Sequence, residues 1–161
     1  MPRRNKNFDL SKLATALEPL IIRSINTHMS HLNNSIQDNL DLGEDIKNQP
    51  FTELSDTTIV NRLMKGQGTK PLVITGNMRK TKVTNAKFGD PVASIDVVGK
   101  SKGKKKIIYG AAHNKGYTNS RGVTVPKREW FGFTKDFKPG GRAYKAMIAN
   151  IWLELKTAWK I

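Results

Sequence analysis

IIYGAAHNKGYTNSRGVTVPKREWFGF, residues 107–133, holds the densest set of structural signals in the chain. It begins with three apolar residues, 107–109, and reaches a polar turn at 113–116, which is typical of a strand that runs into a loop. In its last eight residues, Pro126 fixes one backbone angle just before three aromatic side chains. We expect this segment to be held rigidly and to anchor the surrounding fold.

Two strands are predicted upstream of this segment. Residues 79–83 and 91–99 alternate well enough between apolar and polar side chains to form strands. A basic stretch then leads to Ile107, and we interpret it as a hairpin tip that contacts DNA or an acidic protein, or that is simply solvated. Its lysines, called the lysine loop below, are Lys100, Lys102, Lys104, Lys105 and Lys106.

The residues before position 50 predict a long helix. Apolar residues recur at steps of three and four from Leu10 to Leu40, which places them along one side of a helix that ends near residue 40. Asp9 is the expected N-cap and Gly43 the expected stop. Pro19 interrupts the run, so we expect either a kink there or two consecutive helices.

Two further helices are expected. Ser55 or Asp56 caps a short helix that continues to Met64, and an amphipathic helix behind Gly141 closes the chain. Four residues of this last helix are predicted to face the core: Ile148, Ile151, Trp152 and Leu155. The expected fold is therefore α+β, with a long N-terminal helix, a small mainly antiparallel sheet with a basic hairpin loop, and a C-terminal amphipathic helix. It forms a single domain over 1–161, divided into a helical region (1–49), an α+β core (50–135) and the last helix (136–161).

Composition narrows the possible functions. A chain of 161 residues that is 37% hydrophobic suits one domain with a modest core. It contains no cysteine, which rules out disulfides and thiolate zinc sites, and neither a signal peptide nor a membrane span is expected. The net charge is +15, and residues 77–161 carry 19 Lys and Arg against 5 Asp and Glu. Such a surface favours a polyanion or an acidic protein as partner.

No catalytic residue, metal site or cofactor is predicted. His113 lacks a neighbouring nucleophile or orienting carboxylate, so we interpret it as a hydrogen-bonded structural histidine at a strand end. His28 and His31 lack a third ligand at a convincing spacing. The spacing of Asp90, Asp96 and Glu129 supports no nuclease metal site, and a nuclease ranks last among the functions considered.

Four blocks of sequence, in order, resemble the phage virion morphogenesis family of Mu-like tailed phages, the tail completion or head-tail joining proteins. Similarity to this family covers roughly residues 50–135. At 115 the family commonly has an aromatic residue where this chain has Lys115, which affects partner surfaces rather than the fold. The blocks are FTELSDTTIVNRL at 51–63, KPLVITGNMRKT at 70–81, YGAAHNKG at 109–116 and VPKREWFGF at 125–133.

The resemblance implies a structural protein of the virion, located in the tail-neck region and assembled in the host bacterial cytoplasm. It implies a ring of identical subunits, with a hexamer as one candidate size, that contacts the tail tube and the neck or connector proteins, with DNA as a candidate contact in the lumen. A head-to-tail ring needs two different complementary patches on each subunit. We expect one patch to include Pro126, Arg128, Trp130, Phe131 and Phe133. The alternative, based on charge alone, is a nucleic-acid-binding module.

Overall fold

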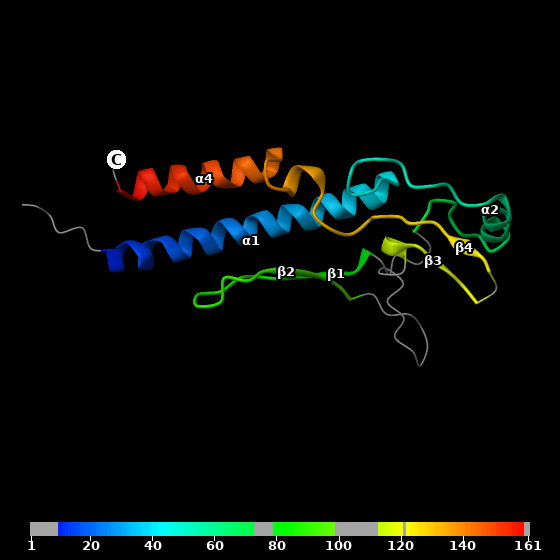
Figure 1. Ribbon diagram of the computed structural model, residues 1–161, viewed down its shortest axis with the longest axis horizontal. Helices are drawn as coiled ribbons and strands as arrows, with labels where there is room; N and C mark the ends of the chain where they lie inside the picture. The colour runs from blue at the N-terminus through cyan, green and yellow to red at the C-terminus, as the bar shows by residue number, and fades with distance from the viewer. Residues whose placement is uncertain (1–9, 73–78, 99–112, 121, 160–161) are drawn as a thin grey trace, which may run out of the picture.

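The computed structural model describes residues 10–72, 79–98, 113–120 and 122–159. Helix α1 (Leu10–Leu42) is the long central element; α4 (Arg142–Trp159) lies along one side of it, and the hairpin of β1 (Thr81–Thr84) and β2 (Ser94–Val97) lies along the other (Figure 1). Beyond the end of α1 lie α2 (Asp56–Leu63) and the short pair β3 (Tyr117–Thr118) and β4 (Thr124–Val125), while the 3-10 helix η2 (Lys135–Phe137) leads into α4. This arrangement confirms the predicted α+β fold.

Helix α1 is one continuous helix. Pro19 lies inside it, so of the two expected alternatives, a kink or two consecutive helices, the second is wrong. The proline is exposed, and its ring therefore faces solvent rather than a neighbouring element. The helix ends at Leu42, near the expected position, where Gly43 adopts a φ of 80° and the Glu44 amide donates to the Asn39 carbonyl over 2.8 Å. The expected N-cap, Asp9, is outside the described residues.

The hairpin is held against α1 by polar side chains of the helix. β1 and β2 pair antiparallel, with Thr81 opposite Val97, which confirms the two predicted strands. At the hairpin turn, the Asn26 side chain accepts from the Ala86 amide over 2.7 Å and donates to the Ala86 carbonyl over 3.1 Å. Further along α1, Asn33 accepts from the Thr81 hydroxyl over 2.6 Å, and Asp41 pairs with Arg79. The hairpin turn and β1 are therefore positioned by one polar edge of α1.

Asn26→Ala should lower the free energy of unfolding by about 1–3 kcal/mol, because it leaves the amide and carbonyl of Ala86 without their partner. Ala86 is only 4% exposed, so water replaces the missing bonds poorly. Urea denaturation measures the effect. Asn34→Ala, at an exposed position of the same helix, is the matched control and should change stability by about 0.5 kcal/mol or less. Equal losses in the two variants would contradict a specific role for Asn26.

The core lies at the C-terminal half of α1. Leu32, Ile36 and Leu40 repeat every fourth residue, so they share one side of the helix, and each is at most 3% exposed. The other members of the buried cluster come from segments far apart in sequence: Phe51, Leu72, Trp130 and Phe137. Trp130 is 1% exposed, which makes the aromatic end of segment 107–133 part of this core.

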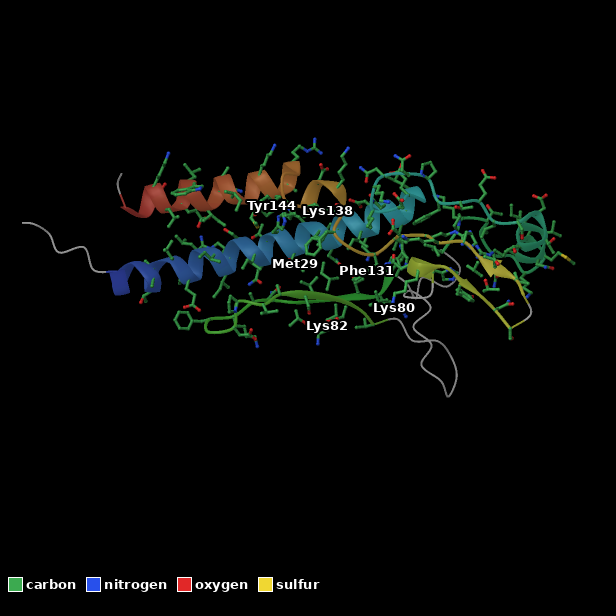
Figure 2. All side chains as sticks on the ribbon, in the orientation of Figure 1. Met29, Lys80, Lys82, Phe131, Lys138 and Tyr144 are labelled. Carbon is green, nitrogen blue, oxygen red and sulfur yellow. The ribbon has the colours of Figure 1, made fainter. Side chains whose placement is uncertain are left out.

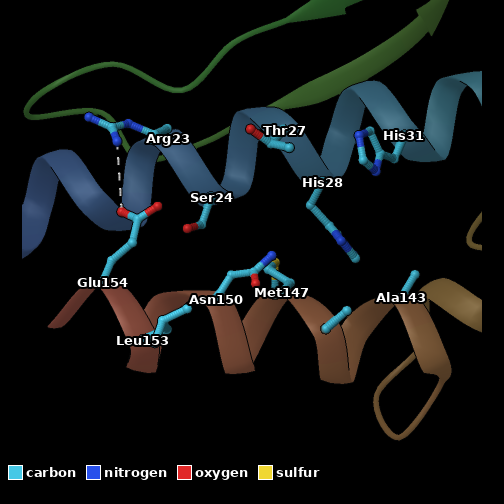
Figure 3. Close-up of a pocket in the computed structure, with 11 residues that line it drawn as sticks. Arg23, Ser24, Thr27, His28, His31, Ala143, Met147, Asn150, Leu153 and Glu154 are labelled. Atoms are coloured by element: carbon cyan, nitrogen blue, oxygen red, sulfur yellow. Dashed lines mark ion pairs between the residues drawn. The ribbon is translucent and has the colours of Figure 1, made fainter. Parts of the chain in front are cut away.

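Helix α4 presents a different face to the core from the one predicted. Trp152 is 61% exposed and Ile148 is 36% exposed, so the expectation that these two face the core is wrong, while Ile151 and Leu155 are half-buried. The side of α4 toward α1 carries Ala143, Met147 and Asn150, as the close-up of the two helices shows (Figure 3). Helical periodicity identified an apolar stripe but could not identify what covers it.

Candidate subunit interface

Arg128 ties together two of the four sequence blocks. Its Nε and Nη2 atoms donate to the Thr52 carbonyl over 3.1 and 3.0 Å, and Nη2 also donates to the Glu53 carbonyl over 3.3 Å. The residue is 5% exposed. A guanidinium presents several donors in a fixed plane, which suits neighbouring carbonyl groups of one chain segment. The block at 125–133 is thereby fastened to the start of the block at 51–63.

A third block joins the same place through Asn114. Its side-chain amide donates to the Phe131 carbonyl and accepts from the Phe131 amide, each over 3.1 Å. The Arg128 amide also donates to the His113 carbonyl over 2.8 Å. Gly116 has a φ of 72°, and a β-carbon there would lie 2.9 Å from the Lys127 nitrogen, so this close approach requires glycine. Segments 113–116 and 127–131 are consequently packed main chain against main chain.

The predicted contact patch is only partly at the surface. Arg128 and Trp130 are buried within the chain, so the prediction that they meet another subunit is wrong. The guanidinium is used to bind main-chain carbonyls, and the indole fills the core instead. Pro126 and Phe131 are half-buried, whereas Phe133 is 52% exposed and remains available to a partner.

An apolar groove surrounds Phe133. It has a volume of about 400 Å³ and lies where α1 meets η2 and the start of α4. Figure 2 shows three of its lining residues, Met29, Lys138 and Tyr144, close to one another. Sequence reasoning did not find this groove, because its walls come from three separate segments. Its apolar walls are formed mainly by Ile25, Met29, Phe133, Phe137, Tyr144 and Met147.

Helix α2 carries a second exposed apolar surface. Val60, Leu63 and the C-cap residue Met64 are 53%, 60% and 81% exposed, and the helix buries none of its residues. The spacing of these three places them on one side of the helix. Arg62 turns the other way, and its Nη1 donates to the Lys70 carbonyl over 2.9 Å. The sequence predicted this helix from its apolar spacing, but it did not show that the apolar side faces outward.

A second cleft, of about 290 Å³, lies between α1 and α4 (Figure 3). Arg23 and Glu154 face each other across it, with 3.8 Å between Nη1 and Oε2. His28 and His31 also line it, and burial, followed by the nearby His31, lowers the pKa of His28. In the parts of the chain that the structure describes, no three His, Asp or Glu side chains come together as metal ligands would.

The lysine loop, Lys100, Lys102, Lys104, Lys105 and Lys106, lies outside the described residues, so its role stays a prediction. The described hairpin that precedes it in the sequence carries exposed lysines. Lys80, just before β1, and Lys82, on β1, are both exposed (Figure 2). Lys87 is exposed in the hairpin turn. Lys82 lies opposite Asp96 in the strand register, so part of this charge is balanced locally.

His113 lies in a cationic environment. Residues 113–115 are helical, and the predicted strand before them, 107–112, lies outside the described residues. Within the described parts of the chain, Nδ1 of His113 has no hydrogen-bond partner, so the predicted hydrogen bond is not found at this nitrogen. Burial, together with the charges of Arg128 and Arg62, lowers the pKa of His113. Burial and the neighbouring Arg62 also lower the pKa of Arg128. The folded protein therefore prefers neutral His113.

Acidification should destabilise the protein through this histidine. A lowered folded pKa gives a stabilisation that is complete above the ordinary value of 6.5 and is lost as the pH falls from there through the folded pKa. Tm should therefore fall as the pH drops below the ordinary histidine value of 6.5. His113→Gln should show a smaller fall than the wild type. Thermal denaturation at a series of pH values tests this, and parallel curves for the two proteins would contradict it.

The described ranges contain no helix that is both long and apolar enough to cross a lipid bilayer. The chain matches no family model, no curated protein and no solved structure. The similarity to the phage virion morphogenesis family therefore stays a prediction that rests on the four sequence blocks.

Proposed function

We propose that this chain is a structural virion protein of a tailed phage or phage-like particle. In this role it completes the upper end of the tail or joins the tail to the head, as a ring of identical subunits. The observation that carries the proposal is the junction at Arg128 and Asn114. Three of the four blocks on which the resemblance rests meet there, through hydrogen bonds between these two side chains and main-chain groups.

This junction supports the proposal because residues shared with a family are expected to lie together when they specify a common core. The Arg128 side chain bonds only to carbonyl groups among the described residues, and Asn114 bonds only to the main chain of Phe131. Both sets of bonds hold the fold and involve no ligand. Two apolar surfaces among the described residues are available to partners: the groove that Phe133 lines and the outer side of α2.

Particles released by the bacterium that encodes the chain provide the test. If the proposal holds, mass spectrometry of purified particles detects the protein at a fixed copy number, and antibody labelling in electron microscopy places it between head and tail. Deletion of the gene should yield unjoined heads and tails. Complete particles that lack the protein, or that form normally without it, would refute the proposal.

A nucleic-acid-binding module is the second candidate, favoured by the net charge of +15 and the exposed lysines of the hairpin. Affinity for duplex DNA, measured over a range of salt concentrations, should then fall steeply as salt rises. Replacing all five lysines of the lysine loop by serine should reduce the salt slope by about one unit for each phosphate that is no longer neutralised. Weaker particle assembly with unchanged DNA affinity would instead favour an acidic protein partner.

A further inference from the structure

Helix α2 turns its apolar side toward solvent, whereas an ordinary surface helix turns that side toward the core. Its half-buried Arg62 points toward the chain and bonds to main-chain carbonyls, while the apolar Val60, Leu63 and Met64 point outward. Met64 is the most exposed of them at 81%. Three apolar side chains at positions i, i+3 and i+4 form the pattern by which a helix inserts into a hydrophobic groove. We call these three residues the α2 knob.

The apolar groove has the character of a site that accepts such a helix face. Its walls are mainly aromatic and aliphatic side chains, and Phe133, one of them, keeps 52% of its surface exposed. Large aromatic side chains that remain exposed in a concave site are typical of binding surfaces. The groove and the α2 knob are thus two exposed apolar surfaces among the described residues of one chain.

The knob and the groove lie apart along the long axis of the molecule, so one copy cannot join its own two surfaces. In Figure 1, α2 lies beyond the C-terminal end of α1, whereas the groove lies beside the middle of α1 at the start of α4. Two different surfaces at separate places form a head-to-tail contact, and repetition of that contact around an axis closes a ring.

The charges at the N-terminal end of α2 are opposite to those beside the groove. Glu53 and Asp56 are exposed at the beginning of α2, in a chain that is otherwise strongly basic. Lys138 lines the groove and is exposed, and Lys145 is exposed on the nearby first turn of α4. A copy that placed its α2 in the groove would therefore bring acidic side chains toward basic ones. Such pairing orients a contact and raises the rate of association.

We infer that the α2 knob of one subunit docks in the apolar groove of a second copy of this chain. The inference identifies the contact between neighbouring subunits of the proposed ring. It rests on the proposed function only for the closure of that ring. The contact itself follows from the exposure of the α2 knob, the shape of the groove and the charges beside them.

The absence of cysteine from the sequence allows a direct test with the full-length protein. One preparation carries Met64→Cys and the other carries Phe133→Cys, and the two are mixed and treated with a short bismaleimide linker. The expected result is a cross-linked dimer that contains one chain of each kind. A protein that carries both substitutions should form a ladder of cross-linked products that ends at the ring size. Mixing Met64→Cys with Val92→Cys, at a hairpin position 68% exposed, is the control and should give no comparable product.

Charge reversal provides an independent measurement. Asp56→Lys should weaken self-association at low salt by about tenfold, and adding Lys138→Glu to it should restore most of the loss. Sedimentation measures both. Cross-linking of Met64→Cys with itself as the main product would indicate a symmetric contact and overturn the inference. A chain that stays monomeric at every concentration would overturn it as well.

Failure of this inference is distinguishable from failure of the proposed function. If particles contain the protein between head and tail but Met64 and Phe133 never cross-link, the docking contact is wrong and the virion role stands. If the expected cross-links form but no particle contains the protein, the contact stands and the virion role is wrong.

Discussion

Trp130→Ala should lower the free energy of unfolding by about 3–5 kcal/mol, the range for removal of a large aromatic side chain from a core. Trp130 is 1% exposed and packs with its neighbour Phe131, with 5.3 Å between the ring centroids. It belongs to the same buried cluster as Ile36 and Leu40. Chemical denaturation measures the loss, and a variant as stable as the wild type would contradict the core assignment.

Trp152→Ala is the matched control, since it removes the same side chain from a position that is 61% exposed. Its effect on stability should be about 0.5 kcal/mol or less. The sequence predicted Trp130 as a contact residue and Trp152 as a core residue, whereas the structure buries Trp130 and exposes Trp152. Any loss of assembly in Trp130→Ala would therefore have to be separated from loss of folding.

Arg128→Met should lower the free energy of unfolding by about 2–3 kcal/mol, because hydrogen bonds from a charged group are stronger than neutral ones and the substitution removes all of them together. The methionine keeps much of the aliphatic stem, so the change reports mainly on the bonds to Thr52 and Glu53. The same substitution removes one cause of the lowered pKa of His113. NMR titration of the variant should therefore give a His113 pKa above that of the wild type.

Two controls separate charge from geometry at this position. Arg128→Lys keeps the charge but loses the planar fork, so its stability should lie between those of the wild type and Arg128→Met. Arg142→Met removes an arginine whose side chain is 88% exposed, and it should leave stability nearly unchanged. A His113 pKa that stays the same in Arg128→Met would contradict the electrostatic link between the two residues.

Local patterns predicted the helices and the hairpin well. The apolar repeat from Leu10 to Leu40 and the alternation in the two strands are each contained within one element, so the sequence carries them directly. Pro19 was harder to interpret, since an exposed proline can be tolerated where the helix already has support on its other sides.

The surfaces were not predictable in the same way. An apolar stripe on α4 or α2 has the same spacing whether it faces a core or a partner, so exposure depends on the tertiary arrangement. The groove is assembled from α1, the segment around Phe133 and the start of α4, and no local window contains it. Arg128 was predicted to contact a partner for a related reason. Its guanidinium binds the main-chain carbonyls of Thr52 and Glu53, and because every residue has a carbonyl, the sequence does not reveal which ones it binds.

Asn26 on α1 and Asn114 use their side chains in the same way, each binding the main chain of one other residue. At each of these two contacts, the chain should tolerate substitution of one residue but not of the other. Each amide recognises only the backbone of its partner residue, Ala86 or Phe131. The partner's side chain can therefore change during sequence divergence without breaking the hydrogen bonds. The asparagine itself cannot be exchanged, even for aspartate, because a carboxylate would place negative charge against a carbonyl oxygen. In distant relatives with this fold, the two amides should persist while the residues they hold drift.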